Sequence, residues 1–154
     1  MPFTPPATNA SKANTGYQSQ FFTGSSASPP AYTAILEVKS FSNDLISIPE
    51  VPTTHLLSPL NTEEFSPGMI KPGKIQVGGN FIGDATQLNF TALAQGQTIF
   101  PFKVTAPVQQ NSKTYTLTGQ GFIVGYKNGP FETNKAIEYM VDIQMTGAYT
   151  ETVA

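Results

Sequence analysis

Residues 135–150 read KAIEYMVDIQMTGAYT, and this stretch decides the fold class. Apolar side chains occupy every second position, and mostly polar ones lie between them. A period of two over ten residues predicts a β-strand with one face in an apolar core. The apolar set is Ile137, Tyr139, Val141, Ile143 and Met145, and the opposite set is Glu138, Met140, Asp142, Gln144 and Thr146.

Other segments show the same alternation or are rich in β-branched and aromatic residues. Over residues 32–42, YTAILEVKSFS, the alternation predicts one continuous strand. In that strand Val38 and Ser40 would share one face, and Lys39 and Phe41 the other. Further strands are predicted over residues 17–23, 46–51, 74–82, 98–105 and 114–126.

One short helix is predicted between the strands. Asp84 lies where a helix N-cap belongs, and Gly96 lies where a helix commonly ends. The order of strands, one helix and more strands predicts a mainly β fold, a β-sandwich or barrel with one flanking short α-helix. The apolar stripe expected on that helix consists of Ala85, Leu88, Ala92 and Leu93.

The chain is expected to form one domain with an N-terminal extension. Its 154 residues are enough to bury a sizeable core. Residues 1–16 are rich in Pro, Ser, Thr and Asn, a composition that cannot order itself alone, so they are predicted to form a flexible arm. Residues 17–154 are predicted to form the single β-sandwich domain.

Residues 52–72, PTTHLLSPLNTEEFSPGMIKP, are predicted to form a long loop. Four prolines oppose both a regular helix and a central strand. A loop this long with many apolar side chains indicates a binding partner, and the alternative is that it folds back as a lid over its own core. The residues expected to contact the partner are Thr53, Thr54, His55, Leu56, Leu57, Phe65, Pro67, Met69 and Ile70.

The composition indicates a protein whose surface is covered by copies of itself. Charged residues make up 12% of the chain, against about 25% in an average soluble domain. The net charge is −2 and none of the eight basic residues is arginine, which argues against binding to phosphate backbones. No apolar run is long enough for a membrane span and no signal peptide is evident, so we expect a soluble protein made in the cytoplasm.

The sequence offers little for catalysis or metal binding. With no cysteine and a single histidine, His55, neither a thiol site nor a multi-histidine metal site can form. Glu63 and Glu64 are adjacent in sequence, and Glu37 and Glu138 could form a carboxylate pair only if the fold brought them across a cleft. We therefore expect no enzyme activity, no cofactor and no metal.

The glycines at 119, 121 and 125 imitate a dinucleotide-binding pattern, but a strand and not a helix is expected there. We predict instead that these glycines permit a bulge or the close approach of another backbone, and we predict the same for Gly78 and Gly79.

Taken together, these segments resemble the tail tube, or major tail, proteins of bacteriophages with long non-contractile tails, the lambda-like group. The helix after Asp84 and the strands FPFKV and FIVGY follow in the order expected for that family. The segments that carry the resemblance are GYQSQFF (16–22), ILEVKSFS (35–42), IPEVPTTHL (48–56) and FSPGMIKPGKIQV (65–77).

The resemblance implies a structural virion protein, assembled in the host cytoplasm. Six copies would close into a ring, and rings would stack into a tube through which the genome passes. In that family the long loop, here 52–72, orders on assembly and bridges neighbours. The implied partners are further copies of the chain, the tail tip and terminator proteins, and the tape measure protein in the lumen, with DNA only in passage and no membrane.

Such a tube would present the polar face of its sheet to the channel. We expect this lumen to be mildly acidic, so that DNA slides without sticking. Lys39 works against that expectation unless it pairs with an acid, and a register slip of one residue would invert the assignment. The residues expected to face the lumen are Glu37, Gln76, Asn80, Glu138, Asp142 and Gln144.

Two other interpretations remain open at this level. A tube subunit of a contractile injection system, or another minor tail component, would share the fold. A carbohydrate-binding adhesin β-sandwich is a more remote alternative, since the chain has no tryptophan to stack on sugars.

Overall fold

A computed structural model describes residues 16, 18–108 and 112–154. The arm predicted over residues 1–16 lies outside these residues apart from Gly16. Within this part of the chain, no helix is both long and apolar enough to cross a membrane.

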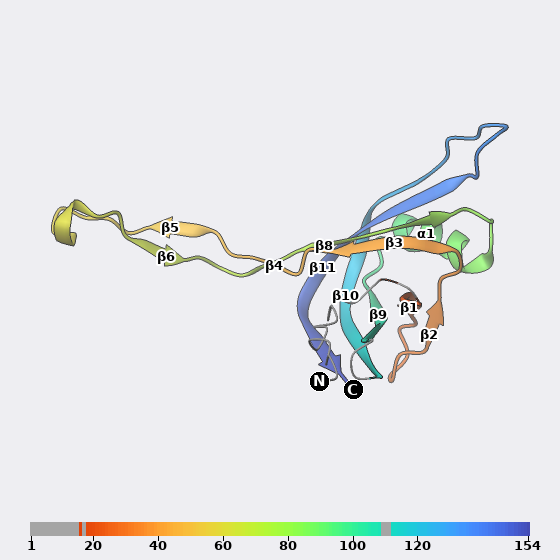
Figure 1. The fold of residues 1–154 in the computed structure, drawn as a ribbon, viewed down its shortest axis with the longest axis horizontal. Coiled ribbons are helices and arrows are strands. Elements are labelled where there is room, and N and C mark those ends of the chain that lie inside the picture. Colours follow the sequence, from red (N-terminus) through yellow and green to blue (C-terminus); the bar gives the residue numbers. More distant parts are fainter. Residues whose placement is uncertain (1–15, 17, 109–111) are drawn as a thin grey trace, which may run out of the picture.

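The body of the protein is a seven-stranded antiparallel sheet of order β2-β1-β9-β10-β11-β8-β3, with one α-helix packed against it (Figure 1). The prediction of a mainly β fold with one flanking helix is confirmed. The strands of this sheet are β1 (Gln20–Gly24), β2 (Tyr32–Ala34), β3 (Val38–Asn43), β8 (Lys74–Asn80), β9 (Phe100–Val108), β10 (Lys113–Asn128) and β11 (Glu138–Val153), and the helix is α1 (Ala85–Gln95).

The sheet curls so that its two halves enclose one core. Buried side chains from β1 and β9 belong to the same cluster as those from β8 and β11. Phe21 and Phe102 stack with ring centroids 6.2 Å apart, and Phe90 of α1 packs at 6.2 Å from Tyr139. The alternation predicted for β11 is confirmed, because Tyr139, Val141, Ile143 and Met145 are all buried.

The continuous strand predicted over residues 32–42 is wrong. The chain breaks at Glu37, whose φ is 58°, and the two pieces become β2 and β3, which lie at opposite edges of the sheet. Curling brings those edges together, so only three residues are needed to connect them. The close packing explains Gly79, because a Cβ there would overlap the carbonyl oxygen of Glu37.

The face assignment within β3 is also wrong, because a register shift between Val38 and Ser40 inserts one extra residue. Val38 and Phe41 both pack against the core as a result, although alternation had placed them on opposite faces. Bulges likewise interrupt the pairing of β10 with β11 near Gly119 and Gly125, which confirms the structural interpretation of those glycines.

The predicted helix is present, but its buried face differs from the predicted stripe. Asp84 caps it by accepting a hydrogen bond from the backbone N–H of Thr86, and Gly96 is its C-cap. Gln87 and Phe90 are fully buried, whereas Leu88 is 52% exposed and Ala85 and Ala92 are also exposed. Of the predicted stripe only Leu93 packs against the core, and the buried amide of Gln87 takes the central position facing the sheet.

The predicted loop is a long hairpin, and it does not fold back over the core. It leaves the body between β3 and β8 and extends far to one side (Figure 1). Two small ladders hold its arms together, and a 3₁₀ turn lies near its tip. Its elements are β4 (Ile46–Ser47), β5 (Glu50–Pro52), η1 (Pro59–Asn61), β6 (Phe65–Pro67) and β7 (Lys71–Pro72).

Candidate assembly surfaces

A polar face covers the side of the sheet that points away from the core, where β3, β8 and β11 run side by side. Cross-strand register places Asn80 opposite Glu138, and Gln76 opposite Asp142. Gln144 lies further along the same face of β11. Five of the six residues predicted to face a lumen are therefore on one surface.

Glu37, the sixth, is not on a strand but in the turn before β3. It joins the same surface because Asn80 Nδ2 donates a hydrogen bond to Glu37 Oε2 at 3.1 Å. Its placement depends on the β2–β3 turn, which alternation along the sequence did not predict.

The acids of the polar face have local partners. Gln76 Nε2 donates to Asp142 Oδ1 at 2.9 Å, and Lys39 Nζ lies 2.6 Å from Glu138 Oε1. The hydrogen bond and the charge of Lys39 lower the pKa of Glu138. Both side chains of this ion pair are more than half exposed, so the pair mainly neutralises surface charge and contributes little to stability.

The polar face is charge-balanced, which corrects the expectation of a mildly acidic surface. Register pairs Lys74 with Gln144 and Lys127 with Met140, so both lysines lie on this face together with Lys39. Within the described residues these three cations match the three acids, Glu37, Glu138 and Asp142. The sequence reasoning missed Lys127 because it did not pair β10 with β11.

Gln144 also has a structural role. Its Nε2 donates to the carbonyl oxygens of Pro72 and Gly73, at 3.0 and 3.1 Å. These bonds tie β11 to the base of the hairpin. Gly73 is required there, since a Cβ would overlap the backbone of Asp44 on the other arm.

Four strands of the sheet form a ribbon with two open edges. The ribbon consists of β3, β8, β11 and residues 122–128 of β10. Among the residues that the structure describes, β3 pairs only with β8, and residues 122–128 pair only with β11, because β9 reaches no further than Gly121. Beside the edge of β3 lies a groove of ≈ 430 Å³, lined by Gly16, Ser19 and Ala106 among others. The backbone N–H and C=O groups along the two open edges, that of β3 and that of residues 122–128, can pair with another chain.

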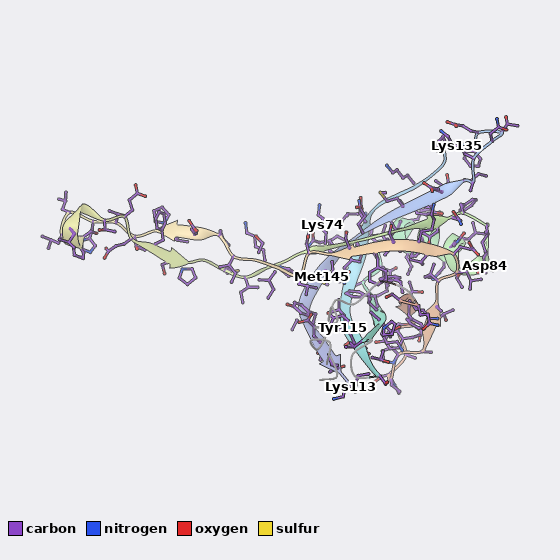
Figure 2. The ribbon with its side chains drawn as sticks, viewed as in Figure 1. Lys74, Asp84, Lys113, Tyr115, Lys135 and Met145 are labelled. Carbon is purple, nitrogen blue, oxygen red and sulfur yellow. The ribbon has the colours of Figure 1, made fainter. Side chains whose placement is uncertain are left out.

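All nine residues predicted to contact a partner lie on the hairpin and are exposed. Leu56 and Leu57 at the tip are 104% and 87% exposed, and Met69 on the returning arm is 84% exposed. Leu60, which was not in the predicted set, is 96% exposed beside them. Figure 2 shows side chains projecting from the hairpin along most of its length, well to one side of the body. The hairpin is therefore an apolar surface that no other described part of the chain covers.

Hydrogen bonds shape the hairpin tip. Ser58 Oγ donates to Glu64 Oε2 at 2.7 Å, and the backbone N–H of Leu57 donates to His55 Nδ1 at 3.1 Å. The serine hydroxyl is therefore bonded to the carboxylate and not to the imidazole, which is not the arrangement of a catalytic triad. These bonds hold the turn that presents the leucines.

Among the described residues, no group of three or more His, Asp or Glu side chains is placed to hold a metal ion. Glu37 and Glu138 share the open polar face, where each is bonded to a neighbour, and do not face each other across a cleft.

Three solved structures illustrate what the chain is similar to. The tail of an empty gene transfer agent particle, refined with C6 symmetry, has a subunit with a TM-score of 0.63 and 16% identity, covering 86% of this chain and 95% of that one. The SPP1 tail tube subunit has a TM-score of 0.64 and 16% identity, covering 92% and 78%. A subunit of the PVC sheath-tube complex, an extracellular contractile injection system, has a TM-score of 0.67 and 11% identity, covering 94% and 95%.

No protein-family model matches the sequence, and no curated protein matches it. At these identities the similarity concerns the fold, and it extends over nearly the whole chain. The curled sheet, the flanking helix and the long hairpin together make this chain a protein with the fold of phage tail tube and injection-system tube subunits.

Proposed function

We propose that this chain is a tail tube subunit, a structural and non-catalytic virion protein whose copies form hexameric rings that stack into the conduit for genome ejection. The observation that carries the proposal is the four-stranded ribbon of β3, β8, β11 and β10 with its two open edges. Residues 17–154 would act as one domain in the tube, with residues 1–16 as an added arm.

The strand directions suit closure into a ring. β3 runs opposite to β8, β8 opposite to β11, and β11 opposite to β10, so β3 and β10 run in opposite directions. In a ring around an axis near the strand direction, the open edge of β3 meets residues 122–128 of the neighbour's β10 as an antiparallel pair. Every copy then has both edges paired, and a ring of heterologous contacts is closed.

The position of the core determines which face would line the channel. One face of the ribbon is covered by the core and α1, so only the polar face can point toward the axis. A charge-balanced polar lining binds phosphate weakly, because no cluster of unpaired cations is present on the described face. Such weak binding supports the proposal that DNA passes through the channel without being held by it.

The hairpin would supply the contacts between rings. Its exposed apolar residues need a partner that the body of the same copy does not provide. The proposed partners are therefore other copies of the chain, with tail tip, terminator and tape measure proteins at the ends and in the lumen. The proposed location is the virion tail, assembled in the host cytoplasm.

We assign the tail to the long non-contractile, lambda-like kind on the resemblance of the sequence segments. A tube within a contractile system is the second candidate, favoured by the TM-score of 0.67 to a subunit of the PVC sheath-tube complex. Micrographs of tails decide between the two, because only a contractile tail carries a sheath.

Electron microscopy combined with hydrogen exchange tests the proposal. The purified chain should form six-fold rings or tubes with a central channel. In residues 38–43 and 122–128, the amides that point away from β8 and β11 should exchange fast in the unassembled chain and slowly in the tube, whereas amides of residues 139–143 should be protected in both. A chain that stays monomeric, or tubes in which neither edge gains protection, would overturn the proposal.

A further inference from the structure

The end of the body opposite the hairpin carries a second set of exposed apolar side chains. Leu36, in the turn between β2 and β3, is 48% exposed, and Ile82, just before α1, is 54% exposed. Phe131, in the loop between β10 and β11, is 67% exposed. We call these three residues the opposite end.

The hairpin and the opposite end leave the ribbon from opposite ends of its strands. β8 begins at Lys74, directly after the hairpin, and finishes at Asn80, which pairs with Glu138 at the start of β11. The loop that holds Phe131 immediately precedes Glu138. Figure 2 shows Lys74 at the base of the hairpin and Lys135 at the tip of that loop, on the far side of the body.

Leu36 and Ile82 are held together by one buried side chain. Gln87 Nε2 donates to the carbonyl oxygen of Leu36 at 3.1 Å, and the backbone N–H of Ile82 donates to Gln87 Oε1 at 2.9 Å. Leu36 and Ile82 are therefore anchored to the core, so this part of the opposite end can receive a partner without reordering.

The charge of the hairpin bears on which surface its tip can contact. Residues 44–73 contain four acids and one lysine, a net charge of −3, in a chain whose total is −2, so the remainder carries +1. Two hairpin tips would therefore repel each other, which disfavours tip-to-tip contact between copies.

We infer that the opposite end is the docking surface for the hairpin tip of a second copy of this chain in the adjoining ring. The contact joins Leu56, Leu57 and Leu60 of one copy to Leu36, Ile82 and Phe131 of the next. Because the two surfaces differ and lie at opposite ends, the contact is heterologous and repeats without limit, as a tube requires. This inference rests on the proposed function and adds the receiving surface to it.

Cysteine cross-linking tests the inference, and the chain is suited to it because it contains no cysteine. In assembled tubes of the double variant Leu57→Cys with Phe131→Cys, a short bismaleimide should give a ladder of covalent multimers. A ladder is expected, and not a dimer, because each copy carries one reactive group at each end. Leu56→Cys and Leu60→Cys are also each combined with Phe131→Cys, in case the thiol at position 57 alone is badly placed for the cross-linker.

Controls separate the possible failures. Ile99 is 56% exposed but directly precedes β9, which starts beside Gly121, midway along β10. Leu57→Cys with Ile99→Cys should therefore give no ladder. Dimers from Leu57→Cys alone would indicate tip-to-tip contact and overturn the inference, as would intact tubes in which no tip position cross-links to Phe131→Cys. Absence of tubes in the unmodified chain would instead contradict the proposed function.

Discussion

The side chain of Gln87 has no exposed surface, yet its amide requires hydrogen-bond partners. It finds them in the backbone: Nε2 donates to the carbonyl oxygens of Leu36 and Asn80, and Oε1 accepts from the N–H of Ile82. One residue thus joins α1 to the β2–β3 turn and to the end of β8. These are the points at which the polar face and the opposite end meet the core.

Replacing this amide should destabilise the fold. In Gln87→Leu, the partly buried backbone groups of Leu36, Asn80 and Ile82 lose their partner, and we expect the free energy of unfolding to fall by about 2–4 kcal/mol. Urea denaturation of unassembled protein measures this. The matched control is Gln95→Leu at the exposed end of the same helix, for which a change within about 0.5 kcal/mol is expected. If both substitutions lowered the free energy of unfolding equally, the hydrogen bonds of Gln87 would not be important for stability.

Lys39 and Glu138 show how the polar face responds to pH. Lys39 lowers the pKa of Glu138, through its hydrogen bond first and its charge second. A carboxyl whose pKa is lowered by folding stabilises the fold at pH values above its unfolded pKa. That contribution disappears as the pH falls through the lowered folded pKa.

Titration followed by NMR should show this shift directly. We expect the side-chain carboxyl of Glu138 to titrate below its ordinary value of 4.5 in the folded chain. In Lys39→Gln the midpoint should move back up, and any stability difference between the two proteins should vanish in acid. An unchanged midpoint in Lys39→Gln would show that the ion pair is not formed in solution.

The hairpin is the element with the least support from the rest of the chain. Its two ladders contain two and three residue pairs, and an isolated two-stranded ribbon is at best marginally stable in water. None of the buried core residues lies between residues 46 and 72. We attribute its extended shape to a requirement of assembly and not of folding.

Removing the hairpin should therefore separate folding from stacking. With residues 46–72 replaced by Asn-Gly, Leu45 and Gly73 can flank a two-residue turn, since their backbones already share a hydrogen bond of 3.2 Å. We expect the free energy of unfolding not to fall, and to rise by up to about 2 kcal/mol, because a shorter loop costs less closure entropy. Microscopy should show rings that do not stack into tubes.

A triple variant provides the control for hairpin length. Serine in place of Leu56, Leu57 and Leu60 keeps the hairpin but removes its apolar tip, and it should also reduce stacking. Long tubes formed by the deletion variant would disprove a bridging role for the hairpin.

At the scale of the whole molecule, the core separates two environments. The polar face lies on one side of the ribbon, and α1 lies on the other. In the proposed tube, the first side faces the channel and the second faces solvent. Asp142 on β11 lies on the side that would face the channel, and the exposed Leu88 on α1 lies on the side that would face solvent.

Reagent size distinguishes the channel from the exterior. In intact tubes, Asp142→Cys should react with a small maleimide but not with a maleimide coupled to a large carrier protein. Leu88→Cys should react with both reagents, and in unassembled protein both positions should react with both. Rapid labelling of Asp142→Cys by the carrier in intact tubes would place the polar face outside the channel.

The sequence predicted β8 and β11 with their correct faces because period two is a local property. Ile75 and Val77, like Tyr139 and Val141, alternate with polar residues regardless of which strands become neighbours. The cap at Asp84 and the end at Gly96 are equally local. The low charge, the absence of cysteine and the apolar content of residues 52–72 could likewise be evaluated without a fold.

Only the tertiary structure decided how these pieces combine. The break at Glu37 exists because the curled sheet brings β2 and β3 together, and the burial of Gln87 exists because three backbone groups converge on it. The pairing of Lys39 with Glu138 and the two open edges depend on which strands become neighbours. These features arise from contacts between residues far apart in sequence, so no local period encodes them, whereas strand alternation, helix caps and composition are encoded residue by residue.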